Sequence, residues 1–354
     1  MSDPASMRLA LIAPPTATVP PSSLGGLEHV RWLAEGLAQR GHEVTLLGAD
    51  LGGLDASRYA FIDTDPTGGE RATPELVDRL HTEQAGKALE LLGRIDLVGD
   101  HTRTGWLPTS GGALPMTAQT TYQPLAGPWA PPRLPPAHVG LVAVSRHQQR
   151  GGLGLPWLDV IHPAVPISEH PLSIAHDGPC VYLGPLLPGS AARAALEAAH
   201  RADRPIVLAG TRPGGEATAY AEVELRPRLG GDDRLLERVS LAERWELLAE
   251  ACCLLALLPY DAPYSLEIVE AMAYGAAVIT MQGTVGAELV RHGCSGLVLT
   301  DPDLLADAIE RAGRLDAAAV RAQAAERFDL PLLVEAYERL FARLLGTEAT
   351  GDGR

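Results

Sequence analysis

The sequence predicts an α/β protein with two domains, each built around a parallel sheet. The chain has 354 residues, about twice the length of a typical domain. Its first fifty residues alternate strand, glycine loop, helix and strand, and a second such series begins near Cys180. Short apolar strands that alternate with helices are typical of parallel sheets, in which a helix carries the chain from one strand to the next.

The first domain opens on a short apolar run that ends at Pro14 and Pro15. From Leu27 to Ala38, apolar residues recur every three or four positions, which indicates an amphipathic helix that ends near Gly41. A proline-rich segment at 125–136 is expected on the surface. In this domain we predict a second helix at 73–92 and strands at 7–13, 42–48, 95–99, 114–120 and 139–145.

The second domain has clearer boundaries, because glycines follow its strands. We place the linker at 163–177 and expect the final helix, 331–345, to pack back on the first domain. The predicted domains are therefore 1–165 together with 330–354, and 176–329. Strands are predicted at 180–183, 206–209, 254–258 and 277–281, and helices at 191–202, 241–252, 266–274, 301–313 and 317–327.

The charge of the chain argues against nucleic acid as a partner. It carries 44 acidic and 29 basic residues, hence 29 − 44 = −15, and Lys87 is the single lysine. Binding to nucleic acid requires a basic surface that displaces counterions from phosphates.

No run reaches the roughly 20 apolar residues of a membrane span. We therefore expect a cytoplasmic protein.

The four cysteines show no metal-binding spacing. Cys252 and Cys253 are adjacent inside an apolar run, while Cys180 and Cys294 stand alone, and no CxxC pair occurs. Cysteines in such surroundings are typical of buried structural thiols. We expect no metal site.

The first candidate binding loop contains Gly25 and Gly26 at the start of the first helix. Glycines at a helix start allow the backbone to approach an anion closely, and the helix dipole favours negative charge there. A simple tight turn would explain the same pair. The loop lacks the GxGxxG arrangement, which disfavours a nicotinamide-dependent dehydrogenase.

The second candidate is His101, directly after the strand predicted at 95–99. Ligands of open parallel sheets bind beyond the carboxyl ends of the strands. A histidine there can contact a substrate hydroxyl through its ring or backbone. A structural histidine is the alternative.

The third candidate loop leads into the helix predicted at 266–274. Asp261 and Pro263 suit a helix start, and Glu267 and Glu270 lie one turn apart. Backbone amides of Tyr264, Ser265 and Leu266 could hold hydroxyl or phosphate oxygens, and Glu270 could accept hydrogen bonds from a ribose. Acidic residues that complement the helix dipole are the alternative.

Over nearly its whole length the chain resembles family 4 of the retaining GT-B glycosyltransferases. The string Glu270-Ala-Met-Ala-Tyr-Gly-Ala-Ala-Val-Ile is similar to the family signature EAMACGTPVI. The other matching segments are Gly25-Gly-Leu-Glu with the helix and strand after it, Asp96-Leu-Val-Gly-Asp-His-Thr, Val142-Ala-Val-Ser-Arg, and Glu288-Leu-Val-Arg-His-Gly-Cys-Ser-Gly-Leu. The length and the proline-rich opening loop are closest to compact members that modify bacterial natural products.

The resemblance implies two facing Rossmann-like domains, a cleft between them and a C-terminal helix that crosses back to the first domain. It implies transfer of a sugar from a nucleoside diphosphate, GDP or UDP, with retained anomeric configuration and without metal or cofactor. Gly25 and Gly26 would contact the diphosphate, and His101 the sugar. Tyr264, Ser265 and Leu266 would offer amides, Glu270 would bind the ribose, and Ser145 and Tyr122 are assigned to the acceptor.

Three positions depart from the family pattern. Pro185 and Ser190 stand where the family has an arginine and a lysine, and Ala262 where it has a glutamate. Cations usually stabilise a diphosphate leaving group. Arg193 and Arg212 are the nearest substitutes in sequence, and we expect at least one to reach the phosphates.

The same departures leave two alternatives open. One is a catalytically silent GT-B protein that acts as an accessory or binding subunit. The other is a GT-B enzyme with different chemistry, which conjugates a nucleotide-activated sugar to a thiol or acts as an epimerase.

Overall fold

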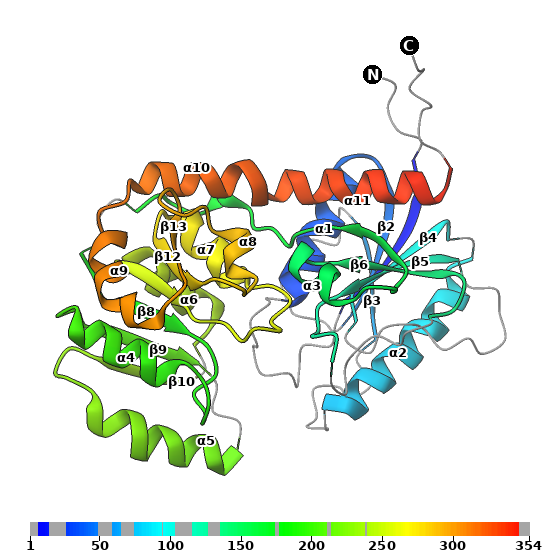
Figure 1. Ribbon diagram of the computed structural model, residues 1–354. Helices are drawn as coiled ribbons and strands as arrows, with labels where there is room; N and C mark the ends of the chain where they lie inside the picture. The colour runs from blue at the N-terminus through cyan, green and yellow to red at the C-terminus, as the bar shows by residue number, and fades with distance from the viewer. Residues whose placement is uncertain are drawn as a thin grey trace. The chain divides into compact units, whose positions relative to one another are not determined.

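The chain divides into two compact units, which are described separately (Figure 1). Described residues up to Pro163 and from Leu330 onward form unit 1, and Ala164–Asp329 lies in unit 2. The computed structural model describes residues 6–13, 26–48, 59–64, 74–93, 95–102, 115–126, 135–173, 177–210, 214–237 and 239–346.

Unit 1 contains a parallel sheet of seven strands in the order β3-β2-β1-β4-β5-β6-β7. Strand β1 lies between β2 and β4, and Ile12 pairs with Leu47 of β2 and Asp100 of β4. The carboxyl ends of β1 and β4 therefore lie together. The strands are β1 (Arg8–Ile12), β2 (Glu43–Gly48), β3 (Ala60–Asp63), β4 (Leu97–Asp100), β5 (Met116–Thr121), β6 (Val139–Ala143) and β7 (Trp157–Val160).

The described helices of unit 1 are α1 (Gly26–Gln39), α2 (Pro74–Leu91), α3 (Arg146–Gly151) and α11 (Leu330–Leu344). Helix α11 buries Leu333, Tyr337 and Phe341 in this unit. These buried apolar residues form the packed face of the last helix.

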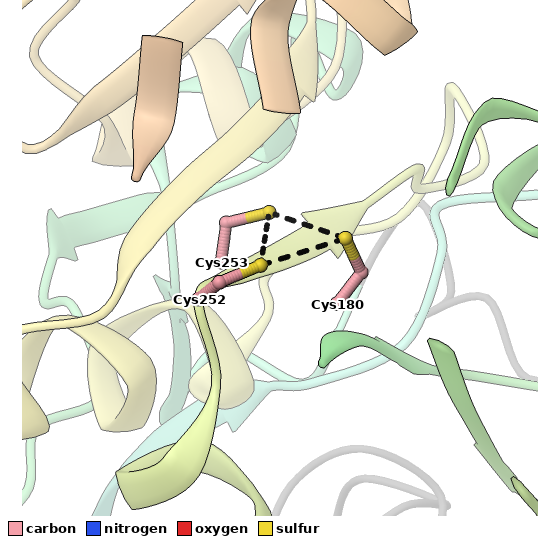
Figure 2. Close-up of side chains that lie close together, drawn as sticks. All are labelled: Cys180, Cys252 and Cys253. Carbon is pink, nitrogen blue, oxygen red and sulfur yellow. Dashed lines mark hydrogen bonds between the residues drawn. The ribbon is translucent and has the colours of Figure 1, made fainter. Parts of the chain in front are cut away.

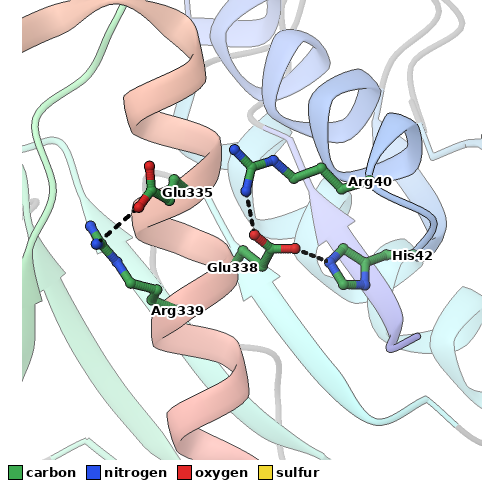
Figure 3. A network of polar contacts seen from close by, with 5 residues as sticks. All are labelled: Arg40, His42, Glu335, Glu338 and Arg339. Carbon is green, nitrogen blue, oxygen red and sulfur yellow. Dashed lines mark hydrogen bonds and ion pairs between the residues drawn. The ribbon is translucent and has the colours of Figure 1, made fainter. Parts of the chain in front are cut away.

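A buried carboxylate ties α11 to the end of α1. Glu338 accepts a hydrogen bond from Arg40 at 2.5 Å and one from Nε2 of His42 at 3.0 Å (Figure 3). The amide of Met7 donates to Nδ1 of His42. Because Nδ1 accepts, the proton of the neutral ring lies on Nε2, and His42 can donate to Glu338 without being charged.

We expect Glu338→Gln to lower the free energy of unfolding of the chain by about 1 to 2 kcal/mol, because hydrogen bonds to a charged group are lost. The control is Glu335→Gln, which removes an exposed ion pair with Arg339 on the same helix (Figure 3). Exposed pairs contribute little. Urea unfolding measures both variants, and equal midpoints would contradict the anchoring role of Glu338.

Unit 2 contains a parallel sheet of six strands in the order β10-β9-β8-β11-β12-β13. One hydrophobic core cluster lies between the sheet and α4 and α9, and includes Leu196, Leu208 and Ile309. The strands are β8 (Cys180–Leu183), β9 (Ile206–Gly210), β10 (Arg234–Glu237), β11 (Cys253–Ala256), β12 (Ala277–Met281) and β13 (Gly296–Leu299). The helices are α4 (Ala192–Arg201), α5 (Gly214–Tyr220), α6 (Leu241–Glu250), α7 (Leu266–Tyr274), α8 (Gly286–Leu289), α9 (Leu305–Ala312) and α10 (Ala317–Phe328).

The segment that enters unit 2 is held by Arg321 of α10. Its guanidinium donates to the carbonyls of Ile167, His170 and Ala273, the last of these in the final turn of α7. Val165 also forms a β-bridge with Asp329, where the chain leaves the unit. The chain is therefore anchored to unit 2 both where it enters this unit and where it leaves it.

The two-sheet α/β architecture confirms the predicted fold class. Every predicted strand and helix has a counterpart, with ends shifted by up to four residues. None of the described helices is long and apolar enough to cross a membrane. Several short elements were not predicted from the sequence. The missed elements are β3, α3, β7, α5, β10, α8 and β13.

Candidate functional site

The start of α7 is the candidate site of unit 2. Helix α7 follows β11, so its first turn lies at the carboxyl edge of the sheet, where parallel sheets bind ligands. Ser265 is the N-cap, with an extended backbone at φ −144°, and Gly275 ends the helix in the left-handed region at φ 89°. All nine helical residues are buried. The backbone that leads into α7 therefore has a fixed position at Tyr264, Ser265 and Leu266.

Glu270 is the central carboxylate of this site. Its side chain is 0% exposed, and Oε1 accepts hydrogen bonds from Arg244 at 2.6 Å and from Nε1 of Trp245 at 3.1 Å. Oε2 is buried and has no hydrogen-bond partner among the described residues. A buried carboxylate oxygen without a partner is costly. This oxygen can accept a hydrogen bond from a bound hydroxyl.

Helix α6 supplies both partners of Glu270. Ser240 and Glu243 form a capping box at its start, with each side chain bonded to the other residue's amide. This cap places Arg244 and Trp245 in the first turn and a half, facing α7. His170 packs its ring on Trp245 and Tyr274, at centroid distances of 4.7 and 5.0 Å. The contacts that Arg244, Trp245 and His170 make in this site were not predicted from the sequence.

Glu267 is a second buried acid beside the same arginine. Its Oε2 accepts a hydrogen bond from Ser265 at 3.0 Å, and Oε1 is 4.0 Å from Nη1 of Arg244. Burial raises the pKa of Glu267 to about 7, although Arg244 opposes this shift. Two buried carboxyl groups therefore share one guanidinium, and near neutral pH Glu267 carries a proton for part of the time.

Ionisation of Glu267 should lower the free energy of unfolding as the pH rises, and we expect Glu267→Gln to abolish this pH dependence. The pKa of Glu267 is raised from 4.5 to about 7 on folding. The stabilisation that this raised pKa contributes to the free energy of unfolding is therefore fully present below pH 4.5 and is lost as the pH rises through 7. The unfolding free energy of the wild type should fall by about 1 to 3 kcal/mol between pH 5 and 8 through this group. Urea unfolding of both proteins tests this, and an equal fall in the variant would contradict it.

His101 lies directly after β4 in unit 1, and its amide donates to the carbonyl of Ile12. Its ring is fully buried. Nδ1 lies 2.8 Å from the hydroxyl of Tyr122, and the ring packs on that of Tyr337 from α11 at a centroid distance of 5.5 Å. Burial lowers the pKa of His101 to about 3, and Nε2 has no partner among the described residues. The ring is neutral at pH 7, so it is no general acid there.

The two residues assigned to the acceptor have structural contacts. Ser145 is the N-cap of α3, and its hydroxyl accepts from the amide of Gln148. The hydroxyl of Tyr122 lies 2.8 Å from Nδ1 of His101. These contacts explain both side chains without an acceptor, and the acceptor role stays a prediction.

The residues predicted to hold the diphosphate are described only in part. Gly26 begins α1, whereas Gly25 and Arg212 lie outside the described residues. Arg193 lies in the first turn of α4, where its half-exposed guanidinium pairs with Glu197 at 2.7 Å and Glu224 at 3.4 Å. A phosphate would have to displace these carboxylates.

The altered positions have local structural roles. The carbonyl of Pro185 accepts from the hydroxyl of Tyr182, and Ser190 accepts from the amide of Ala192 at the start of α4. The amide of Ala262 donates to the carbonyl of Pro259, which closes a turn. None of these side chains can supply a cation or a carboxylate.

Comparison with known proteins gives a family match in unit 2. Residues 180–313 match the family described as "Glycosyl transferases group 1". This segment includes Glu270, Glu267 and Arg244. No curated protein matches the chain.

Solved structures match over nearly the whole chain. AviGT4, a glycosyltransferase involved in avilamycin A biosynthesis, is 24% identical with a TM-score of 0.68, and the match covers 96% of this chain and 98% of that one. Sucrose-phosphate synthase from Thermosynechococcus elongatus is 17% identical, with a TM-score of 0.73 and coverages of 96% and 99%. HepE from Anabaena, in complex with UDP and glucose, is 16% identical, with a TM-score of 0.68 and coverages of 95% and 100%.

At these identities the solved structures show the fold, and the family match concerns the second unit. The chain therefore has the GT-B fold, and together these findings support a glycosyltransferase.

Proposed function

We propose that the chain is a retaining glycosyltransferase of family 4 that moves a sugar from a nucleoside diphosphate to a small-molecule acceptor. The observation that carries this proposal is the buried Oε2 of Glu270 in α7, which has no hydrogen-bond partner among the described residues and lies inside the matched segment. A ribose hydroxyl would satisfy this oxygen. Because AviGT4 takes part in avilamycin A biosynthesis, we place the reaction in specialised metabolism, such as antibiotic biosynthesis.

In the proposed reaction unit 2 binds the donor. Glu270 accepts from the ribose, and the amides of Tyr264, Ser265 and Leu266 donate to sugar and phosphate oxygens. The bond between the anomeric carbon and the diphosphate breaks, and the acceptor oxygen bonds to the same face of the sugar. The diphosphate takes the acceptor proton, so the neutral His101 need only contact the sugar. Stabilisation of the leaving group by amides and cations is the main catalytic effect.

The reaction can be tested without a known acceptor. The protein is incubated with UDP-glucose or GDP-mannose, with water as the slow acceptor, and the released sugar is followed by NMR before its anomers equilibrate. We expect release of nucleoside diphosphate together with the anomer that has the donor's configuration. The inverted anomer would contradict the retaining mechanism.

The diphosphate clamp gives a separate prediction. We expect Arg193→Ala combined with Arg212→Ala to weaken binding of the nucleoside diphosphate about tenfold or more, because charge-assisted hydrogen bonds to phosphate are lost. Arg226→Ala is the control, since Arg226 forms an exposed pair with Glu222 of the same kind as that of Arg193. Calorimetry measures the affinities. Unchanged binding in the double variant would show that neither arginine reaches the phosphates.

A catalytically silent binding protein is the second candidate. It is favoured by Pro185, Ser190 and Ala262, which remove two cations and a carboxylate from the family pattern, and by the acidic partners of Arg193. Such a protein would bind a partner or ligand as an accessory subunit, without turnover. Epimerised or thiol-linked sugars among the products would instead indicate other GT-B chemistry.

A further inference from the structure

Three free cysteines of unit 2 bring their sulfur atoms together. Cys180 begins β8 and Cys253 begins β11, and the two residues are paired in register on neighbouring strands. Cys252 directly precedes β11, and its amide donates to the carbonyl of Pro179. Figure 2 shows the three thiols pointing toward one another. Their exposed fractions are 0%, 2% and 0% for Cys180, Cys252 and Cys253.

The sulfurs form a nearly regular triangle. The Sγ distances are 3.6 Å for Cys180 and Cys252, 3.8 Å for Cys252 and Cys253, and 4.0 Å for Cys253 and Cys180. A cation bonded to three sulfurs at about 2.3 Å, with tetrahedral to trigonal angles, requires sulfur separations of about 3.8 to 4.0 Å. The three thiols match this requirement within about 0.2 Å, so a cation could bind without moving the strands.

The geometry at Cys252 and Cys253 is unusual for adjacent residues. Consecutive side chains of a strand point to opposite faces of the sheet. Here the backbone turns just before β11, where the Cys252 amide bonds to Pro179, and both sulfurs lie on the same side. Cys252 therefore adds a third sulfur to the cross-strand pair of Cys180 and Cys253.

Ligand chemistry favours a soft cation. Three sulfurs suit Cu(I), which thiolates select, whereas a structural zinc site has four protein ligands. Among the described residues, this trio is the group of His, Cys, Asp and Glu side chains whose ligand atoms come within metal-binding range, and it contains no fourth ligand.

We propose that Cys180, Cys252 and Cys253 form a buried three-sulfur site for a single soft cation, with Cu(I) as the best match. Thiols that ionise release their protons to solvent on binding, and no electron is transferred. The trio lies at the amino ends of β8 and β11, whereas α7 begins beyond the carboxyl end of β11. The bound ion would join β8 to β11 and stabilise unit 2 independently of the donor site.

The experiment titrates the reduced full chain with Cu(I) without oxygen, in competition with the chromophoric chelator bicinchoninate. We expect one Cu(I) per chain, an X-ray absorption spectrum with three sulfur neighbours and a higher melting temperature. Cys180→Ser, Cys252→Ser and Cys253→Ser should each weaken binding by at least about tenfold. Cys294→Ser is the matched control and should bind as the wild type does.

Two results would overturn the proposal. One is a wild-type chain that takes no Cu(I) from the chelator. The other is an equal loss of affinity in Cys294→Ser. Circular dichroism establishes which variants are folded, and if a serine variant does not fold, the wild-type stoichiometry and sulfur coordination still decide the question.

Discussion

Replacing Arg244 with methionine is expected to lower the free energy of unfolding of the chain by about 3 to 5 kcal/mol. The change leaves the fully buried Glu270 without the guanidinium that bonds to its Oε1, while methionine keeps much of the side-chain volume. Removal of one partner from a buried ion pair is costly because the other charge stays buried. Guanidinium chloride unfolding followed by circular dichroism measures the change.

A second substitution separates charge from packing. In Arg244→Met combined with Glu270→Gln, the buried carboxylate is also removed, so part of the lost stability should return. Arg226→Met is the surface control, because it breaks an exposed pair with Glu222 on the same unit and should change stability little. An Arg244→Met protein with wild-type stability would show that Arg244 does not support Glu270.

Glu270→Gln is expected to weaken the binding of nucleoside diphosphate by about 10- to 100-fold. The amide oxygen of glutamine can still accept from Arg244, but its NH₂ group donates where Oε2 would accept from the ribose. Calorimetry measures the affinity, and the matched control is Glu335→Gln, an exposed glutamate of α11. Equal affinity of Glu270→Gln and the wild type would remove Glu270 from the donor site.

The fold was largely predictable from the sequence because its main elements are buried and well delimited. Helix α7 and strands β8 and β12 were predicted with the observed ends, and glycine directly follows both α7 and β8. The missed strands β3, β7, β10 and β13 have four residues each, and both end residues of β3 and β10 are exposed. Their order in the sheet comes from pairing with a neighbour, which a local pattern does not contain.

The candidate site was predictable only where its residues lie in one segment. Glu270 and the turn before it form a continuous motif, whereas Arg244 and Trp245 lie about one helix and one strand earlier and meet Glu270 only in the folded unit. The capping box of Ser240 and Glu243 is a local signal for the start of α6. Likewise, the cysteine spacing gave no indication that Cys180 meets Cys252, 72 positions later.

The central claim is that unit 2 binds an activated sugar nucleotide at the start of α7. Calorimetric titration of the wild-type chain with UDP, GDP, ADP, CDP and dTDP tests it most directly. We expect one of these nucleotides to bind with one site per chain. Failure of all five to bind would contradict the claim.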